Sequence, residues 1–236
     1  MIWEDAKHYV KEDDDVKQLI ERLGDIDSFI LPDDYYKLWE DVSKGVQVKK
    51  AQENNLSPAE AEESFKKLCR RPYYLTTIAK EFGVKNIAEV GTAQGLQFYS
   101  FAKYVDENHS NSGHVWSCDI IDARNKEYSQ KYNHLTTFCL GTSEHLASVL
   151  EQSNTSIDLF YIDASHQQGA VLNDIRMMKR FQHEDTVWVF DDFDLRFGCY
   201  EDIKFLCKLN KKFKIYSVGN TASGKPNHQV VIFGKL

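Results

Sequence analysis

The sequence predicts an α/β fold, with a seven-stranded, mostly parallel sheet, helices on both of its faces and a helical N-terminal extension. Three observations predict it. From residue 85 onward, short apolar runs alternate with amphipathic stretches long enough for a helix. The last two apolar runs are instead joined by the turn formers NTASGKPNH, which favours an antiparallel pair at one side of the sheet. Residues 1 to about 68 contain no convincing strand.

Each apolar run is short and rich in residues that favour strands, and the arrangement is Rossmann-like. The seven predicted strands are residues 86–90, 114–118, 136–140, 157–162, 186–190, 214–218 and 229–233. Helices are expected from Leu96 to Tyr104, from about Gln167 and around 199–210. The apolar positions of the second of these are expected to face the core, and Asn173 and Asp174 its outer surface. Those apolar positions are Val171, Leu172, Ile175 and Phe181.

The N-terminal part reads as helices. Apolar residues at helical spacing predict a first helix that ends at Gly24; they are Val16, Leu19, Ile20 and Leu23. Ser57 and Pro58, followed by acidic residues, predict the start of a second helix. Residues 73–82 form a third, ended by Gly83. We therefore divide the chain into a helical extension, residues 1–70, and an α/β domain, residues 71–236.

Composition excludes several classes of protein. The 236 residues carry a net charge of −7, which disfavours a nucleic acid as partner. No apolar run approaches the roughly 18 residues needed to span a bilayer, and the N-terminus is acidic where a signal peptide would be basic. The five cysteines include no C-x-x-C pair, which predicts free, buried thiols in a reducing compartment. These features predict a cytoplasmic protein with no membrane partner.

A glycine-containing turn follows the first strand. Residues 87–95 read IAEVGTAQG, so Gly91 and Gly95 bracket a turn that opens a helix. Glycine lets the backbone approach a ligand closely, and a helix N-terminus presents free N–H groups. Asp119 ends the second strand, where a carboxylate can accept both hydroxyls of a ribose. Small polar groups after the third strand, Gly141 to Glu144, suit the rim of an adenine pocket.

These three elements in this order resemble the S-adenosylmethionine site of class I methyltransferases, over roughly residues 70–236. The resemblance implies that Asp119 holds the ribose and that Ser143, with Glu144, holds the adenine. It implies that the methionine end is held by Glu89, Gly91, Thr92 and Gly95. The alternative is an α/β fold that binds a different nucleotide.

Aspartates follow the fourth and fifth strands. Residues 157–166 read IDLFYIDASH and residues 186–192 read TVWVFDD, so Asp163, Asp191 and Asp192 should converge at the carboxyl edge of the sheet. Three adjacent carboxylates raise one another's pKa unless a cation neutralises them. Oxygen ligands suit Mg²⁺, Mn²⁺ or Ca²⁺. The alternative is that these are solvated residues at strand ends, with Asp192 capping the next turn.

The aspartates resemble the metal site of cation-dependent O-methyltransferases. The run D-A-S-H-x-x-x-x-V-L-x-D-I, followed by F-D-D, resembles the branch that contains sugar and natural-product O-methyltransferases. Gln168 departs from the aromatic residue that is frequent there, which weakens the inference about the acceptor. The resemblance implies that Asp163, Asp191 and Asp192 bind Mg²⁺ or Mn²⁺ and that Asp163 also lies beside the cofactor.

His166 is the predicted general base, because an imidazole titrates near neutrality and this one lies three residues after Asp163. Asp194 is a second candidate for this role or for an acceptor contact. Arg70 and Arg71 could contact the cofactor carboxylate or an acceptor, although basic side chains at a helix entry are usually solvated.

Taken together, the sequence predicts an S-adenosylmethionine-dependent and metal-dependent O-methyltransferase that acts on a hydroxyl of a sugar, as part of a glycan or a glycosylated metabolite. One alternative is a catechol-type O-methyltransferase, which requires an apolar acceptor wall from the N-terminal helices. The other is a catalytically silent module that binds the cofactor. The N-terminal helices could cover the acceptor or form a homodimer contact.

Overall fold

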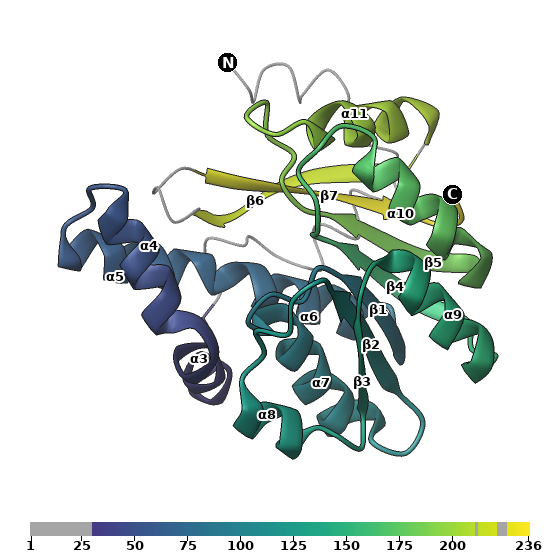
Figure 1. Ribbon diagram of the computed structural model, residues 1–236, viewed down its shortest axis with the longest axis horizontal. Coiled ribbons are helices and arrows are strands. Elements are labelled where there is room, and N and C mark those ends of the chain that lie inside the picture. Colours follow the sequence, from purple (N-terminus) through teal and green to yellow (C-terminus); the bar gives the residue numbers. More distant parts are fainter. Residues whose placement is uncertain (1–29, 211, 221–225) are drawn as a thin grey trace.

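The computed structural model describes residues 30–210, 212–220 and 226–236. The predicted helix that ends at Gly24 lies outside these residues. Within them, the chain forms one seven-stranded sheet with helices on both faces and further helices at the N-terminal side (Figure 1). No helix of the described segments is long and apolar enough to cross a membrane.

The strand order is β3-β2-β1-β4-β5-β7-β6. The first five strands along the chain pair in parallel, and β7 is antiparallel to both β5 and β6. The strands are β1 (Asn86–Val90), β2 (His114–Asp119), β3 (Thr136–Leu140), β4 (Ile157–Ile162), β5 (Gln182–Phe190), β6 (Phe213–Asn220) and β7 (Pro226–Phe233). The predicted seven strands, the parallel majority and the antiparallel pair are confirmed.

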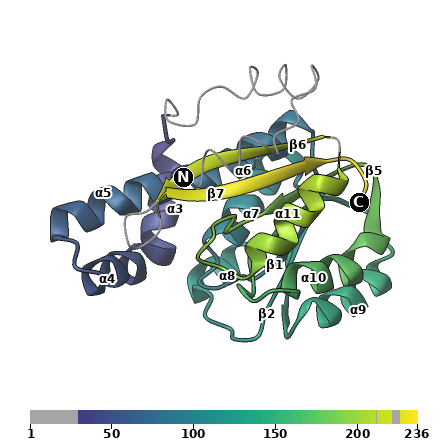
Figure 2. The ribbon, with the colours of Figure 1, turned by 90° about the horizontal axis from the view of Figure 1, so that it is seen from above.

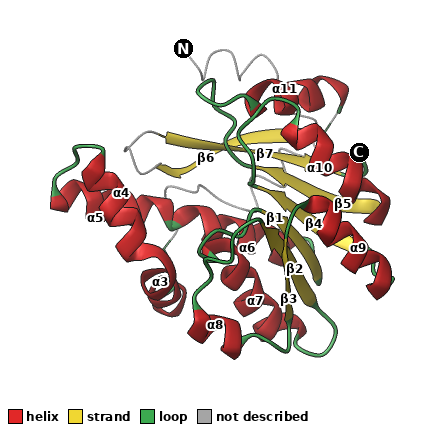
Figure 3. Ribbon diagram, viewed as in Figure 1, coloured by secondary structure: helices red, strands yellow, loops and turns green. Residues whose placement is uncertain are grey.

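The helices precede the sheet or connect its strands (Figure 3). At the N-terminal side lie α3 (Asp33–Trp39), a π-helical turn (Glu40–Lys44), α4 (Gly45–Glu53), α5 (Pro58–Leu68) and α6 (Arg70–Glu81). The connecting helices are α7 (Leu96–His109), α8 (Lys126–Lys131), α9 (Ser143–Ser153), α10 (Ala170–Met178), extended by a 3₁₀ turn (Lys179–Phe181), and α11 (Cys199–Leu209).

Two apolar cores hold the layers together. Residues of α3, α5, α6, α7 and α8 pack on one face of the sheet, and residues of α9, α10 and α11 pack on the other. Figure 2 shows the sheet between these two sets of helices. The alternation of side chains along each strand explains the division, because Ile87 of β1 faces the first core and the adjacent Ala88 faces the second.

The start of α5 illustrates how local sequence sets an element. The Ser57 hydroxyl accepts from the Glu60 backbone N–H at 3.4 Å, and the Glu60 carboxylate accepts from the Ser57 backbone N–H at 2.8 Å. This reciprocal capping, with Pro58 at the first helical position, satisfies N–H groups that the helix cannot pair internally. The apolar side of this helix is buried: Ala61, Phe65 and Leu68.

The prediction for α10 was confirmed in part, because Val171 and Ile175 are buried as expected. The helix begins at Ala170 rather than near Gln167, and Leu172 is 37% exposed instead of facing the core. Asp174, which was assigned to the outer surface, is only 8% exposed. All five cysteines are free and buried, as predicted.

Candidate functional site

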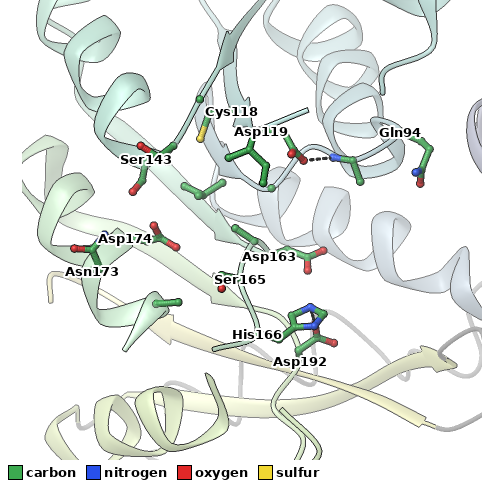
Figure 4. Close-up of a pocket in the computed structure, with 18 of the residues that line it drawn as sticks. Gln94, Cys118, Asp119, Ser143, Asp163, Ser165, His166, Asn173, Asp174 and Asp192 are labelled. Carbon is green, nitrogen blue, oxygen red and sulfur yellow. Dashed lines mark hydrogen bonds and ion pairs between the residues drawn. The ribbon is translucent and has the colours of Figure 1, made fainter. Parts of the chain in front are cut away.

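A cavity of about 710 Å³ lies at the carboxyl ends of the parallel strands (Figure 4). Backbone hydrogen bonds continue past the ends of the strands, so the loops that follow neighbouring strands lie side by side at this edge of the sheet. Gly91 donates to Cys118 at 2.9 Å, Asp163 donates to Val90 at 2.8 Å and Asp191 donates to Ile162 at 3.0 Å. The residues after β1, β2, β4 and β5 therefore meet at one edge, as expected for an open α/β sheet.

The turn between β1 and α7 forms one wall. Gly91, Ala93 and Gln94 line the cavity. Gly91 has φ +100°, and a Cβ atom there would lie 1.9 Å from the backbone oxygen of Asp163. Only glycine permits this close approach, so the turn can pack directly against the end of β4.

Most of the residues predicted to hold the methionine end lie behind this wall. Gly91 lines the cavity, whereas Glu89, Thr92 and Gly95 are not among the lining residues. Glu89 is 1% exposed and accepts from the Ser117 hydroxyl at 2.6 Å. Burial raises the pKa of Glu89 to about 8. The Glu89 carboxyl therefore links β1 to β2 beneath the turn between β1 and α7 and does not reach the cavity.

Asp119 faces the cavity from the end of β2. One carboxylate oxygen accepts from the Ala93 backbone N–H at 2.8 Å and the other accepts from the Ile121 N–H at 3.2 Å. Ser143 also lines the cavity and is 2% exposed. Glu144 is exposed and lies outside the lining. The two predicted nucleoside contacts at the cavity surface are thus Asp119 and Ser143.

Three side chains from β4 and β5 ends form a compact group. Asp163, His166 and Asp192 each offer a ligand atom, and these atoms all lie within 4.8 Å of one another. His166 Nε2 lies 2.6 Å from Asp192 Oδ2 (Figure 4). Asp192 has φ +56°, a conformation that is uncommon for a residue other than glycine and that turns its carboxylate toward His166.

Asp191 lies apart from this group. Its side chain is 1% exposed, and its Oδ2 lies 2.5 Å from Arg71 Nη1 and accepts from the Tyr161 hydroxyl at 3.0 Å. The same Tyr161 hydroxyl lies 2.9 Å from Asp163 Oδ2, and Arg71 Nη2 lies 3.8 Å from that oxygen. Arg71 from α6 thus neutralises Asp191, and Tyr161 links Asp191 to Asp163.

The carboxylates remain crowded despite Arg71. Burial and the neighbouring Asp191 raise the pKa of Asp163 well above its usual range, and they also raise the pKa of Asp192. The hydrogen bond to Asp192 raises the pKa of His166. A divalent cation would relieve the repulsion, and the carboxylate oxygens of Asp163 and Asp192 are ligands that Mg²⁺ or Mn²⁺ accepts. The residues therefore fit the implied metal.

Asp194, the second candidate for the general base or an acceptor contact, pairs with Arg196. Its Oδ2 lies 2.9 Å from Arg196 Nε and 2.5 Å from Arg196 Nη2. Burial opposes ionisation, but the bonds from Arg196 outweigh it and lower the pKa of Asp194. Asp194 is also absent from the cavity lining.

The comparisons with known proteins agree with this geometry. Residues 88–193 match a family model described as a methyltransferase domain. This segment is therefore similar to methyltransferase domains. This segment extends from β1 to just beyond Asp192, so it contains both the glycine turn and the acidic group. The predicted resemblance to class I methyltransferases is confirmed over this segment. No curated protein sequence matches the chain significantly.

The α/β sheet and its helices have the fold of solved O-methyltransferases. The O-methyltransferase from Bacillus cereus, solved in complex with SAH, is 15% identical with a TM-score of 0.59; the match covers 88% of this chain and 94% of that one. The O-methyltransferase TomG from Streptomyces achromogenes, involved in tomaymycin synthesis and solved in complex with SAM, is 13% identical with a TM-score of 0.56. That match covers 70% of this chain and 80% of TomG.

Several residues that line the cavity were not predicted from the sequence. Gln47 and Lys50 of α4 line the cavity, as do Asn173 and Asp174 of α10. Asp174 is part of the run D-A-S-H-x-x-x-x-V-L-x-D-I, so its place in that motif was the available signal. The two α4 residues carried no such signal, because only the packing of α4 beside the sheet brings them to the cavity.

Proposed function

We propose that this protein is an S-adenosylmethionine-dependent and divalent-metal-dependent O-methyltransferase that methylates a sugar hydroxyl on a glycan or glycosylated metabolite. The proposal rests on one observation: residues of both the predicted cofactor site and the predicted metal site line the same cavity. One cavity is lined by Gly91 and Asp119 and also by Asp163, His166 and Asp192. A nucleoside-binding wall and a group of acidic and imidazole side chains therefore share one space.

On the cofactor side, Asp119 is the proposed acceptor for the ribose hydroxyls and Ser143 the proposed contact for the adenine. Gly91 is proposed to face the methionine end through its backbone. Glu89, Thr92 and Gly95 are proposed to shape that turn from behind, consistent with the buried hydrogen bond between Glu89 and Ser117.

Asp163 and Asp192 are the proposed ligands of a Mg²⁺ or Mn²⁺ ion. When bound there, the cation would hold the acceptor oxygen and lower its pKa. Asp191 is proposed to support this site indirectly, since Arg71 pairs with it and Tyr161 links it to Asp163.

His166 is the proposed base. Because its Nε2 donates to Asp192 at 2.6 Å, Nδ1 is the atom left to accept the proton of the acceptor hydroxyl. Asp192 then stabilises the imidazolium that forms, and it also fixes the orientation of the ring. The 50% exposure of the His166 side chain leaves it accessible to an acceptor.

The preference for a sugar follows from the N-terminal helices. A catechol acceptor would call for an apolar wall, but the residues that α4 contributes to the cavity are Gln47 and Lys50. An amide and an ammonium group can hydrogen-bond to several hydroxyls. Their position also supports a role for the extension in covering the acceptor rather than in a homodimer contact.

The test measures release of S-adenosylhomocysteine from S-adenosylmethionine with a panel of sugar glycosides and catechols, in Mg²⁺ or Mn²⁺ and again in EDTA. We expect turnover with sugars that EDTA abolishes. His166→Ala should lower turnover by about 10²–10⁴-fold and keep Mn²⁺ binding by calorimetry, whereas Asp163→Ala should lose Mn²⁺ binding. Asp185→Asn, an exposed change at the opposite end of β5, is the control.

Each component of the proposal can fail separately. Turnover that persists in EDTA would exclude the metal, and turnover with catechols alone would exclude the sugar. Loss of Mn²⁺ binding in His166→Ala would make His166 a metal ligand instead of the base. Cofactor binding without turnover on any acceptor would favour the silent module.

A further inference from the structure

Arg71 is a largely buried cation beside the proposed metal ligands. It is the second residue of α6, and its side chain is 16% exposed. The apolar side of α6 fixes the helix, since Tyr74, Leu75 and Ile78 lie in the core on that face of the sheet. The packing of α6 therefore holds the Arg71 guanidinium against the carboxyl ends of β4 and β5.

Two carboxylates share this guanidinium. Arg71 Nη1 lies 2.5 Å from Asp191 Oδ2, and Nη2 lies 3.8 Å from Asp163 Oδ2. The Tyr161 hydroxyl lies 2.9 Å from the Asp163 oxygen and 3.0 Å from the Asp191 oxygen. A hydroxyl has one proton to donate, so it can donate to only one of the two carboxylates at a time. Arg71 supplies the positive charge that the pair requires.

The positive charge of Arg71 also acts on the cavity. Burial and the nearby Asp191 raise the pKa of Asp163 and that of Asp192, and Arg71 opposes both shifts. A guanidinium is always charged in a protein. A divalent cation bound by Asp163 and Asp192 would therefore always be repelled by this neighbouring charge.

Asp191 would otherwise be available to the cation, because it follows β5 directly and precedes the proposed ligand Asp192. The three residues whose ligand atoms lie within 4.8 Å of one another do not include Asp191. Its Oδ2 contacts Arg71 instead. The guanidinium therefore neutralises Asp191 in place of a metal ion.

We propose that Arg71 is an internal counter-ion that competes with the divalent cation: it keeps Asp191 from ligating the ion and weakens the affinity of the site for the metal. This inference rests on the proposed function, because it takes Asp163 and Asp192 as the ligands. An ion held by two protein carboxylates rather than three keeps more of its coordination positions for water or an acceptor. Arg71 acts through Asp191 and is thus a positioning residue.

The test measures binding of Mn²⁺ alone by calorimetry, without cofactor or acceptor. Arg71→Met removes the charge and should bind Mn²⁺ about 10- to 100-fold more tightly than wild type, because the guanidinium no longer repels the ion. Arg71→Lys keeps the charge and should stay within about threefold of wild type. Arg180→Met is the matched control, since Arg180 lies just before the opposite end of β5 and its side chain is 49% exposed.

A double variant separates the effect of charge from a role as ligand. Arg71→Met combined with Asp191→Asn removes one positive and one negative charge, so the net charge beside the metal site is unchanged. This variant should bind Mn²⁺ within about threefold of wild type, because Asp191 does not ligate the ion. Replacing both partners of a buried ion pair often preserves stability, and thermal denaturation establishes that each variant is folded.

The outcomes separate this inference from the proposed function. Unchanged or weaker Mn²⁺ binding by Arg71→Met overturns the competition, and a large loss of binding in the double variant makes Asp191 a ligand; both results leave the proposed metal site in place. Binding by Arg71→Met but not by wild type supports the competition and overturns the metal dependence of the wild-type reaction. Failure of wild type and of every variant to bind Mn²⁺ overturns both.

Discussion

Asp191 and Asp192 are neighbours in the sequence, yet their carboxylates have different partners. Asp191 is buried against Arg71 and Tyr161, whereas Asp192 contacts His166. The positive φ of Asp192 separates the two side chains by turning the chain directly after β5. One carboxylate thereby becomes part of an internal charge network, and the next faces the cavity.

The contact with Asp192 should be visible in the titration of His166. The hydrogen bond raises the pKa of His166, so NMR of the EDTA-treated protein should show it titrating above its usual value of about 6.5. Asp192→Asn should lower this pKa. A base must be neutral, so turnover should rise with pH as His166 loses its proton.

The same shift has a consequence for stability. Because the folded-state pKa is raised, the pair stabilises the fold fully below the unfolded-state pKa, and this contribution is lost as pH rises through the folded-state pKa. The stability difference between wild type and Asp192→Asn should therefore shrink between those two pKa values. A His166 that titrates at or below about 6.5 in wild type would disprove the contact.

Individual site residues were predictable where a strand end fixed them. Asp119 and Asp163 directly follow an apolar run and Asp192 lies one residue further on, so their place at the sheet edge followed from the strand pattern alone. The separation of Asp191 from Asp192 did not follow, because it depends on one backbone dihedral. The burial of Asp174 did not follow either, because an acidic residue on a helix is usually exposed to solvent.

At the scale of elements, the strand residues that could be predicted from the sequence are the apolar, buried ones. All seven strands were found because their central residues are largely apolar, and in β4 and β1 these residues are also buried on both faces. The first four residues of β5, Gln182 to Asp185, were missed because they are polar. Gln182 pairs with Ile157 across the sheet, so this end of the strand depends on its partner rather than on its own apolar character.

The turn between β1 and α7 should be intolerant of any side chain. In Gly91→Ala the new Cβ would collide with the Asp163 backbone oxygen, and the positive φ would add strain. We expect a loss of about 3 kcal/mol in the free energy of unfolding and weaker binding of S-adenosylhomocysteine. Urea denaturation and calorimetry measure the two effects.

Gly169 provides a matched control for this prediction. Its φ is +85°, but a Cβ there would meet nothing within 4 Å. Gly169→Ala should therefore carry only the cost of the backbone conformation, about 1 kcal/mol. Equal losses in the two variants would mean that backbone strain alone, and not the close approach to Asp163, makes glycine necessary at the turn.

At the scale of the whole molecule, the N-terminal helices contribute both to the apolar core on one face of the sheet and to the lining of the cavity. Trp39 of α3 is fully buried, and its Nε1 donates to the Ser100 hydroxyl of α7 at 2.7 Å. Phe65 of α5 lies in the same core. Meanwhile α4 contributes Gln47 and Lys50 to the cavity. The packing of these helices on α7 thus also positions one side of the proposed acceptor site.

We therefore predict that the extension and the α/β domain unfold as one unit. Trp39→Ala should lower the free energy of unfolding by about 4 kcal/mol, because it leaves a large cavity in the shared core. Urea denaturation should show a single transition by both tryptophan fluorescence and circular dichroism. Trp39→Phe, which keeps much of the packing and loses the bond to Ser100, should cost less. Two separate transitions, with only the first shifted by Trp39→Ala, would show instead that the extension is an independent unit, and the division at residue 70 would then be a true domain boundary.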